Sequence, residues 1–332
     1  MGSSRLPTKV LPNLLSAIYL LTLVIKCTTN LSQRSCMTSK KRMTGNFVDN
    51  LRYYFKHNNT NLKSNYSYIS TDFGKVRVFD TKGKKPVIIS VPDGPNVIEH
   101  HENLISELSR DFRIVCFEFF GIGKSYPNSK FNYSLNKASS LIINIMDILR
   151  IDRAILCFSC SNGLYAIKTA ELFPNRIVHL FLSQTPSMNA MVKWTDMNIP
   201  KILRYPVIGQ IVNSVTEKKL TKIWYKQALP KETDKTNYVK TAISSLENGG
   251  CFCLSGLVQG LEKEKKTKMN VLEVPSTIIW GTKDYTHRKT DNKSIIEHLP
   301  NCEIIEFENC GHFPELEDSK RYVKLINEKL KR

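Results

Sequence analysis

The first 48 residues contain no acidic residue, and the whole chain lacks internal repeats, low-complexity tracts and zinc-finger or basic-zipper spacing. Seven of the 48 basic residues lie in that acid-free segment, and the others are dispersed among acids. Aromatic and basic residues do not alternate as they do in proteins that bind single-stranded nucleic acid. The net charge of +18 favours acidic partners in general, such as anionic lipid. We expect no nucleic-acid partner.

The chain also lacks the even, paired cysteine spacing of a disulfide framework, because its cysteines number nine. Cys116 and Cys157 lie inside apolar runs, where a free thiol behaves as a small hydrophobic group. Cys251 and Cys253 form a C-x-C pair with no partner pair after it. We expect reduced structural thiols and a reducing compartment for the folded part.

Four of the histidines do not have the sequence spacing of metal ligands: His100, His101, His179 and His298. The stretch "GIGKS" is too short for a phosphate-binding loop of the G-x-x-x-x-G-K-[ST] type. We therefore expect neither a metal nor a cofactor.

The amino-terminal segment is distinct in composition. Residues 10–27 ("VLPNLLSAIYLLTLVIKC") are mostly apolar and have basic residues on both sides. The run is slightly short for a comfortable membrane span and lacks a clean signal-peptide cleavage site. We expect residues 1–45 to be a targeting or membrane-anchor segment, with anchor, signal and transit peptide all open. The protein would then be membrane-associated or organelle-targeted, the alternative being cytoplasmic.

Short β-branched runs alternate with helical patterns from about residue 70. The expected strands are 75–80, 86–91, 112–119, 153–158, 177–184, 275–280 and 302–307, and the clearest helices are 134–150, with Ser134 as its cap, and 318–330. This alternation predicts an α/β fold with a mostly parallel sheet covered by helices on both faces.

Residues 187–270 interrupt the alternation with helical spacing and almost no strand pattern. We therefore expect the first part of the α/β core at 46–186, a helical cap at 187–270 and the second part of the core at 271–332.

Two glycine-containing loops carry a family resemblance. "FEFFGIGKSYP" resembles the D-x-x-G-x-G-x-S-x-x-P loop, and "VPDGPN" resembles the L-H-G-G-P-G loop, of the α/β-hydrolase fold. The order of elements over residues 65–332 is similar to the cap-bearing branch with proline iminopeptidases, epoxide hydrolases and meta-cleavage C–C hydrolases. The resemblance implies that Gly94 supplies an oxyanion-hole amide, while Pro92 and Asp93 replace the usual His-Gly.

The stretch "AILCFSCSNGLYA" (154–166) corresponds to the nucleophile elbow of that family. The small-residue rule of G-x-S-x-G favours Ser161, which has Ser159 two residues before it and Gly163 two residues after it. The ungapped register of the family pattern on both sides favours Cys160. Both remain open as nucleophile, with Cys160 preferred. A tight turn without catalysis is the third interpretation.

The same resemblance supplies the rest of a catalytic triad. Asp284 follows a predicted strand in "WGTKD", and His312 lies in "GHFP" ahead of the last helix. Nucleophile, acid and histidine come in the chain order of this fold. His312 would accept the nucleophile's proton and Asp284 would orient the imidazole. The amide after the nucleophile, Ser161 if Cys160 attacks, would complete the oxyanion hole.

These features predict a hydrolase of the esterase or thioesterase type, acting on a small acyl substrate through a covalent acyl-enzyme. An acyltransferase would use the same chemistry with another acceptor. Epoxide hydrolases and haloalkane dehalogenases use an Asp nucleophile, which this stretch lacks. The alternative from another class is a non-catalytic binding or scaffold protein of the same fold. The departures from the family pattern at Pro92, Asp93, Phe158 and Asn162 support it.

Overall fold

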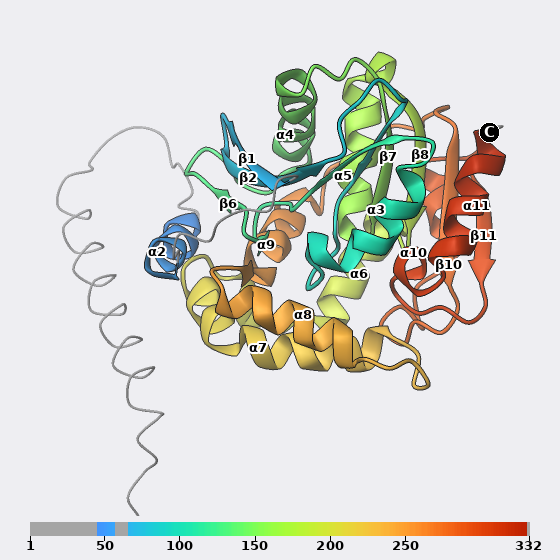
Figure 1. Cartoon of the computed structure of the whole chain (residues 1–332). Helices are drawn as coiled ribbons and strands as arrows, with labels where there is room; N and C mark the ends of the chain where they lie inside the picture. The colour runs from blue at the N-terminus through green and yellow to red at the C-terminus, as the bar shows by residue number, and fades with distance from the viewer. Residues whose placement is uncertain (1–44, 57–65, 331–332) are drawn as a thin grey trace, which may run out of the picture. The chain divides into compact units, whose positions relative to one another are not determined.

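Helices cover both faces of a mostly parallel sheet in the computed structural model, which describes residues 45–56 and 66–330 (Figure 1). The strands are β1 Tyr66–Thr71, β2 Gly74–Asp80, β3 Val87–Ser90, β4 Arg113–Phe117, β5 Ile122–Gly123, β6 Tyr126–Pro127, β7 Ala154–Ser159, β8 Ile177–Ser183, β9 Cys251–Phe252, β10 Ser276–Gly281 and β11 Glu303–Phe307. The α-helices are α2 Asn46–Lys56, α3 Glu102–Leu108, α4 Leu135–Ile148, α5 Ser161–Leu172, α6 Met188–Asn198, α7 Ile208–Ala228, α8 Thr236–Glu247, α9 Leu254–Glu264, α10 Pro314–Glu317 and α11 Ser319–Lys329. Short 3-10 helices lie at Ile98–His101, Pro174–Arg176, Lys201–Arg204 and Asn292–Glu297.

The main sheet has the strand order β1-β2-β4-β3-β7-β8-β10-β11, with β6 paired to β2. Every pair from β4 to β11 is parallel, whereas β1, β2 and β6 pair in antiparallel fashion. The predicted α/β class with a mostly parallel sheet is confirmed. Because the parallel strands share one direction, the loops that follow them emerge at one edge of the sheet.

Two apolar clusters hold the helices to the two faces of the sheet. In β3 and β7, Ile88 and Ile155 face the cluster that contains α3 and α11. Their neighbours Ile89 and Leu156 face the opposite cluster, which contains α4 and α5. Successive side chains of a strand alternate between faces, so a continuous apolar run fits a strand that is covered on both sides. Full burial of one such side chain contributes roughly 1.5–3 kcal/mol.

The strands and helices predicted from the sequence lie within a few residues of the observed ones. Ser134 caps α4 as expected, since its side chain accepts a hydrogen bond from the amide of Lys137 at 3.4 Å. Strand β1 was not predicted, because its solvent-exposed positions carry polar side chains. The two-residue strands β5 and β9, which pair with each other, were not predicted either.

Helices α6 to α9 lie between β8 and β10 in the sequence, and we call them the inserted helices (residues 188–264). Figure 1 shows α7 and α8 side by side, away from the sheet. Their function as a cap, and the domain boundaries given above, stay predictions.

Across residues 45–56 and 66–330, every helix is too short or too polar to cross a membrane. The predicted anchor at residues 10–27 lies outside the described residues, so this finding does not bear on it. The cysteines of the described part are all free thiols.

Candidate active site

The predicted site residues come together at the carboxyl edge of the sheet. Asp93 and Gly94 follow β3, Cys160 follows β7, Asp284 follows β10 and His312 follows β11. Such loops are the usual place for a ligand in an open α/β sheet. Each of these side chains therefore begins from a fixed strand end, which sets its position.

Cys160 occupies the sharp turn between β7 and α5. Its backbone has φ 53° and ψ −128°, a conformation that non-glycine residues rarely adopt. Strained backbone conformations of this kind occur most often at active sites and ligand-binding sites. The turn is held by a hydrogen bond from the Cys160 amide to the Ser183 carbonyl at 2.8 Å. Gly163 allows α5 to lie close to the loop after β8, because a Cβ at this position would be only 2.1 Å from Thr185 Oγ1. This is the local structure expected for a nucleophile elbow.

The three neighbouring side chains of "SCS" lie in different surroundings. Ser159 is the last residue of β7 and donates its hydroxyl to Glu315 Oε1 at 2.8 Å. Ser161 is the first residue of α5. Cys160 and Ser161 both line the cavity described below, and Ser159 does not. The strained turn position belongs to Cys160 alone of the three.

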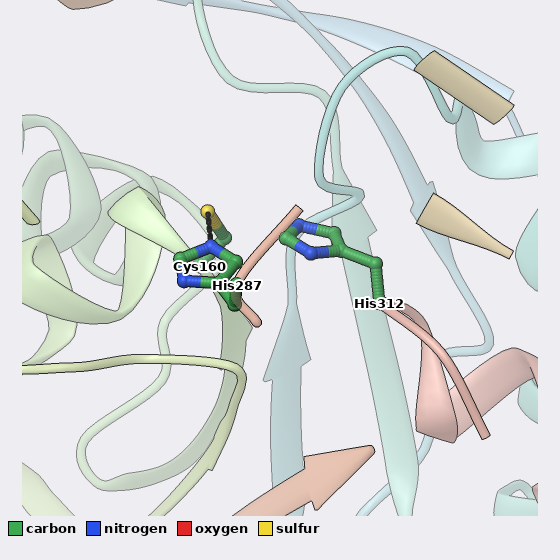
Figure 2. A group of neighbouring side chains, drawn as sticks. All are labelled: Cys160, His287 and His312. Atoms are coloured by element: carbon green, nitrogen blue, oxygen red, sulfur yellow. Dashed lines mark hydrogen bonds between the residues drawn. The ribbon is translucent and has the colours of Figure 1, made fainter. Parts of the chain in front are cut away.

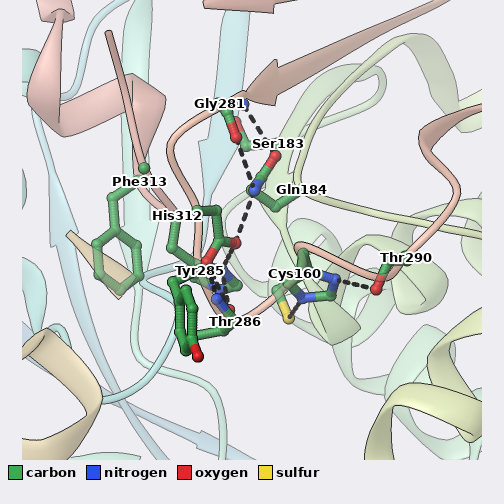
Figure 3. Close-up of polar contacts among 12 residues, drawn as sticks. Cys160, Ser183, Gln184, Gly281, Tyr285, Thr286, Thr290, His312 and Phe313 are labelled. Atoms are coloured by element: carbon green, nitrogen blue, oxygen red, sulfur yellow. Dashed lines mark hydrogen bonds and ion pairs between the residues drawn. The ribbon is translucent and has the colours of Figure 1, made fainter. Parts of the chain in front are cut away.

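Asp284 and His312 form a buried pair. Asp284 Oδ2 lies 2.6 Å from His312 Nδ1 and accepts a further hydrogen bond from Gln184 Nε2 at 2.7 Å. Thr286 donates its amide and its hydroxyl to the other carboxylate oxygen, at 2.8 Å and 2.7 Å. Gln184 is itself fixed by the Gly281 amide (Figure 3).

This pairing controls the charges of both groups. Burial alone would raise the pKa of Asp284, but the His312 charge and hydrogen bond hold it below its ordinary value. Burial alone would lower the pKa of His312, but the charge and the hydrogen bond of Asp284 raise it well above its ordinary value. Asp284 therefore stays a carboxylate that orients the imidazole through Nδ1.

Asp93 lies on the other side of the imidazole. Its Oδ2 atom is 3.1 Å from His312 Nε2, the nitrogen that in a triad faces the nucleophile. Burial raises the pKa of Asp93, and a backbone hydrogen bond from Gly94 opposes this. The Asp93 carboxylate is thus hydrogen-bonded to the ring nitrogen that would accept the Cys160 proton in a catalytic triad. It also takes a hydrogen bond from Gly94, the residue expected to supply the oxyanion-hole amide.

His287, three residues after Asp284, is a second histidine at the site. Its Nε2 atom lies 3.9 Å from Cys160 Sγ (Figure 2). The ring stacks on Trp194 at 5.0 Å and on His312 at 5.2 Å between centroids. Burial lowers the pKa of His287 to about 3, so its ring is neutral. Burial, followed by the charge of Asp93, raises the pKa of the Cys160 thiol to about 11.

A small, mainly apolar cavity of about 30 Å³ adjoins Cys160. Asp93, Gly94, Cys160 and Ser161 line its polar end. The inserted helices supply apolar side chains to the rest, among them Met191, Trp194, Trp224, Leu257, Val258 and Leu261. Sites for small molecules are usually concave, apolar and equipped with a few polar groups of this kind.

The structure thus brings Cys160, Ser161, Gly94, Asp284 and His312 to one place, as the sequence analysis expected. It adds residues that were missed as site residues, Asp93, Gln184 and His287. Asp93 was visible in the sequence only as a departure from the family's loop. Gln184 and His287 had a weaker signal, since each simply follows a strand that ends at the same edge.

The chain is similar in sequence to several hydrolases. The chain is 21% identical over 286 residues to 2-hydroxy-6-oxononadienedioate/2-hydroxy-6-oxononatrienedioate hydrolase of Burkholderia vietnamiensis, covering 81% of this chain and 96% of that protein. It is 26% identical over 155 residues to zearalenone hydrolase of Bionectria ochroleuca, covering 44% of this chain but only 58% of that protein. A third relative, 3-oxoadipate enol-lactonase 1 of Acinetobacter baylyi, is 21% identical over 224 residues and covers 67% of this chain and 80% of its own. These relatives are hydrolases, which supports hydrolytic activity here.

Solved structures show the same fold. A mutant epoxide hydrolase from Bacillus megaterium superposes with a TM-score of 0.65 at 18% identity, covering 80% of this chain and all of its own. A putative acyltransferase from Salmonella enterica gives a TM-score of 0.67 at 13% identity, covering 82% and 97%. The family description "alpha/beta hydrolase fold" matches residues 86–319, most of the described part. Together with the sheet and the loops at its carboxyl edge, this match shows that the chain belongs to the α/β-hydrolase fold family.

Proposed function

We propose that the protein hydrolyses acyl substrates, esters or thioesters, with Cys160 as the nucleophile. One observation carries this proposal: Cys160 holds the strained turn between β7 and α5, beside a histidine whose Nδ1 is 2.6 Å from a buried carboxylate. A nucleophile, a base and an orienting acid in this arrangement define covalent acyl transfer.

The chemistry follows from the positions of the groups. Cys160 Sγ attacks the acyl carbonyl carbon while the thiol proton passes to His312 Nε2. The carbonyl oxygen becomes an oxyanion, for which the amides of Gly94 and Ser161 are the nearest candidates. His312 then gives its proton to the leaving group. Finally, His312 activates a water that hydrolyses the thioester and frees Cys160.

Asp93 must leave His312 Nε2 and carry away the proton that the two share, so that Nε2 can accept the thiol proton. In the resting arrangement one proton lies between Asp93 Oδ2 and His312 Nε2, which are 3.1 Å apart. A negative carboxylate there would also repel an oxyanion held by Gly94. We propose that substrate binding displaces the Asp93 side chain, so that Asp93 limits the rate of the enzyme.

Cys160 is favoured over Ser161 by the backbone. A nucleophile elbow presents the side chain of the turn residue, and that residue has φ 53° at Cys160. Ser161 then contributes its amide, which any residue would supply. The apolar lining of the cavity favours an acyl group without charge.

A second function has support from the Asp93 contact. A carboxylate against His312 Nε2 and a thiol whose pKa is raised to about 11 by burial both oppose nucleophilic attack. They favour a protein that binds a small apolar molecule in the same cavity and does not turn it over.

Turnover of an activated ester separates the two functions. We expect the wild-type protein to hydrolyse a p-nitrophenyl acyl ester and Cys160→Ala to lose that activity. Cys157→Ala is the matched control, because Cys157 is a buried thiol of β7, three residues before Cys160, and packs in the cluster on the α3 and α11 face. Wild-type turnover that Cys160→Ala retains would refute Cys160 as the nucleophile. No wild-type turnover of any acyl ester or thioester would leave only the binding function.

We also propose that residues 1–45 direct the protein to a membrane or an organelle. The basis is the apolar run at 10–27 with basic flanks. A chain without residues 1–45 should stay folded and lose that association in a carbonate wash of cell membranes. Retention of the truncated chain in the membrane pellet would refute this role.

A further inference from the structure

The side chains of Cys160, His287 and His312 form a compact donor group. One donor atom from each, the thiol sulfur and a ring nitrogen of the two histidines, lies within 4.8 Å of the others (Figure 2). All three residues are buried. The hydrolytic mechanism above uses Cys160 and His312 but gives His287 no task.

The distances are close to those of a tetrahedral metal site. With Zn–S near 2.3 Å and Zn–N near 2.0–2.1 Å, sulfur and nitrogen ligands of one zinc ion lie about 3.5 Å apart. Cys160 Sγ and His287 Nε2 are 3.9 Å apart without an ion. A contraction of a few tenths of an ångström, within the reach of side-chain rotation, would place both on one ion.

Each histidine is already oriented as a metal ligand would be. The second ring nitrogen of a metal-bound histidine usually donates to a carboxylate or another oxygen, which fixes the ring. His312 Nδ1 is 2.6 Å from Asp284 Oδ2, and His287 Nδ1 is 3.1 Å from Thr290 Oγ1. In both rings Nε2 is therefore the nitrogen that could bind an ion between the three side chains.

Asp93 lies next to this group of three but outside it, and its carboxylate would have to turn from His312 Nε2 toward the ion to become the fourth donor and balance the charge. Its Oδ2 atom lies 3.1 Å from His312 Nε2, and it lines the same cavity as Cys160. A thiolate and a carboxylate together neutralise a divalent cation. A set of one sulfur, two imidazole nitrogens and one carboxylate oxygen suits Zn²⁺ better than Mg²⁺ or Ca²⁺, which prefer oxygen ligands.

We propose that Cys160, His287 and His312, with Asp93 as fourth donor, bind a thiophilic divalent cation such as Zn²⁺. Binding requires the Cys160 thiol proton and the proton between Asp93 and His312 to pass to solvent. The bound cation holds Cys160 Sγ and His312 Nε2 at once, so it stops acyl transfer. This inhibition rests on the proposed function, whereas the binding itself does not.

We choose Co²⁺ as the probe, because it binds in place of Zn²⁺ and its absorption spectrum depends on the ligands that it has. The full chain titrated with Co²⁺ should develop a thiolate-to-cobalt charge-transfer band together with the visible bands of tetrahedral cobalt, and Zn²⁺ should remove both. Cys160→Ala should lose the charge-transfer band. His287→Gln should weaken Co²⁺ binding by about 100-fold or more, since even the loss of an outer partner costs 10–100-fold.

Two matched variants test the specificity of the signal. Cys302→Ser removes a half-buried thiol outside the site, and His179→Gln removes a histidine that contacts Thr277 within the sheet. Both should keep the wild-type spectrum. A cooperative melting transition without metal shows that Cys160→Ala and His287→Gln still fold. Zn²⁺ should raise the melting temperature of the wild type and of the two controls but not of Cys160→Ala or His287→Gln.

The outcomes separate the two proposals. The site is refuted if the wild-type chain shows no charge-transfer band, if Cys160→Ala keeps it, or if His287→Gln binds Co²⁺ as the wild type does. Ester turnover that Zn²⁺ abolishes in the wild type supports both proposals. A Cys160-dependent cobalt band in a chain without ester turnover keeps the metal site and removes the hydrolase.

Discussion

The two loops that contact His312 differ in how far they follow the family pattern. The loop after β10 brings Asp284 to within 2.6 Å of His312 Nδ1, as a catalytic triad requires. The loop after β3 brings Asp93 to within 3.1 Å of His312 Nε2, where the family loop has a glycine and no side chain. One side of the imidazole is therefore arranged for catalysis, and the other holds a charge that must move first. The proposed activity therefore needs the contact made by the first loop and a movement of the second.

The largest expected effect falls on His312, the histidine that both loops contact. His312→Gln should lower the turnover of an activated ester by about 10²–10⁴-fold, because the general base is lost. His179→Gln, a histidine of β8 away from the site, should keep wild-type turnover. Circular dichroism of both variants checks the fold. Equal turnover in wild type and His312→Gln would mean that the Asp284–His312 pair is structural only.

The loop that follows the family pattern was also the easier of the two to predict. Asp284 follows the buried strand β10, and His312 follows the half-buried edge strand β11. The ends of these strands fix positions that short motifs such as "GHFP" then mark. The parallel sheet was predictable for the same reason, since its strands are continuous apolar runs. Strand β1 was harder, because its exposed face carries polar residues that weaken the pattern.

Contacts between distant side chains were not predictable. The sequence shows that Asp93 replaces a glycine, but not that its carboxylate turns toward His312, which is 219 residues away. His287 likewise reaches Cys160 only because β7 and β10 end at the same edge with β8 between them. Such contacts depend on rotamers and packing, which no local pattern encodes.

A second prediction concerns the support of the loop that carries His312. Glu317 accepts hydrogen bonds from the amides of Gly311 and Phe313, at about 3.0 Å, and burial raises its pKa to about 7. The folded state therefore holds a proton that the unfolded chain releases near pH 4.5. Since the folded state binds more protons, its stability should fall as pH rises from about 4.5 to 7, by roughly 3 kcal/mol.

Glu317→Gln should remove this part of the pH dependence. Urea unfolding at pH 5 and at pH 7.5 measures it, with the exposed Glu308→Gln as the matched control. If Glu317→Gln loses as much stability over that range as the control, Glu317 is not the group that titrates.

The third prediction tests the loop that departs from the pattern. Asp93→Gly should raise the turnover of an activated ester by at least about 10-fold, because it frees His312 Nε2 and the Gly94 amide for the reaction. Asp93→Asn removes the charge but keeps a side chain beside His312, so its gain should be smaller. A loss of activity in Asp93→Gly would show instead that Asp93 takes part in the chemistry, and the contrast between the two loops would fail.

The smallest expected effect falls on Ser161. Ser161→Ala should change ester turnover by less than about threefold, because alanine keeps the backbone amide that Ser161 would donate to the oxyanion. Steady-state kinetics with the same ester measure this change. A loss as large as that of His312→Gln would show that Ser161, and not Cys160, is the nucleophile.

The central claim, that Cys160 forms the acyl-enzyme, is tested most directly by intact-protein mass spectrometry after a brief reaction with an activated acyl ester. A Cys160 acyl-enzyme should give one added acyl group that neutral hydroxylamine removes, as it does a thioester. The adduct should be absent in Cys160→Ala and present in Ser161→Ala. An adduct that survives in Cys160→Ala and disappears in Ser161→Ala, or that resists neutral hydroxylamine in the wild type, would contradict it.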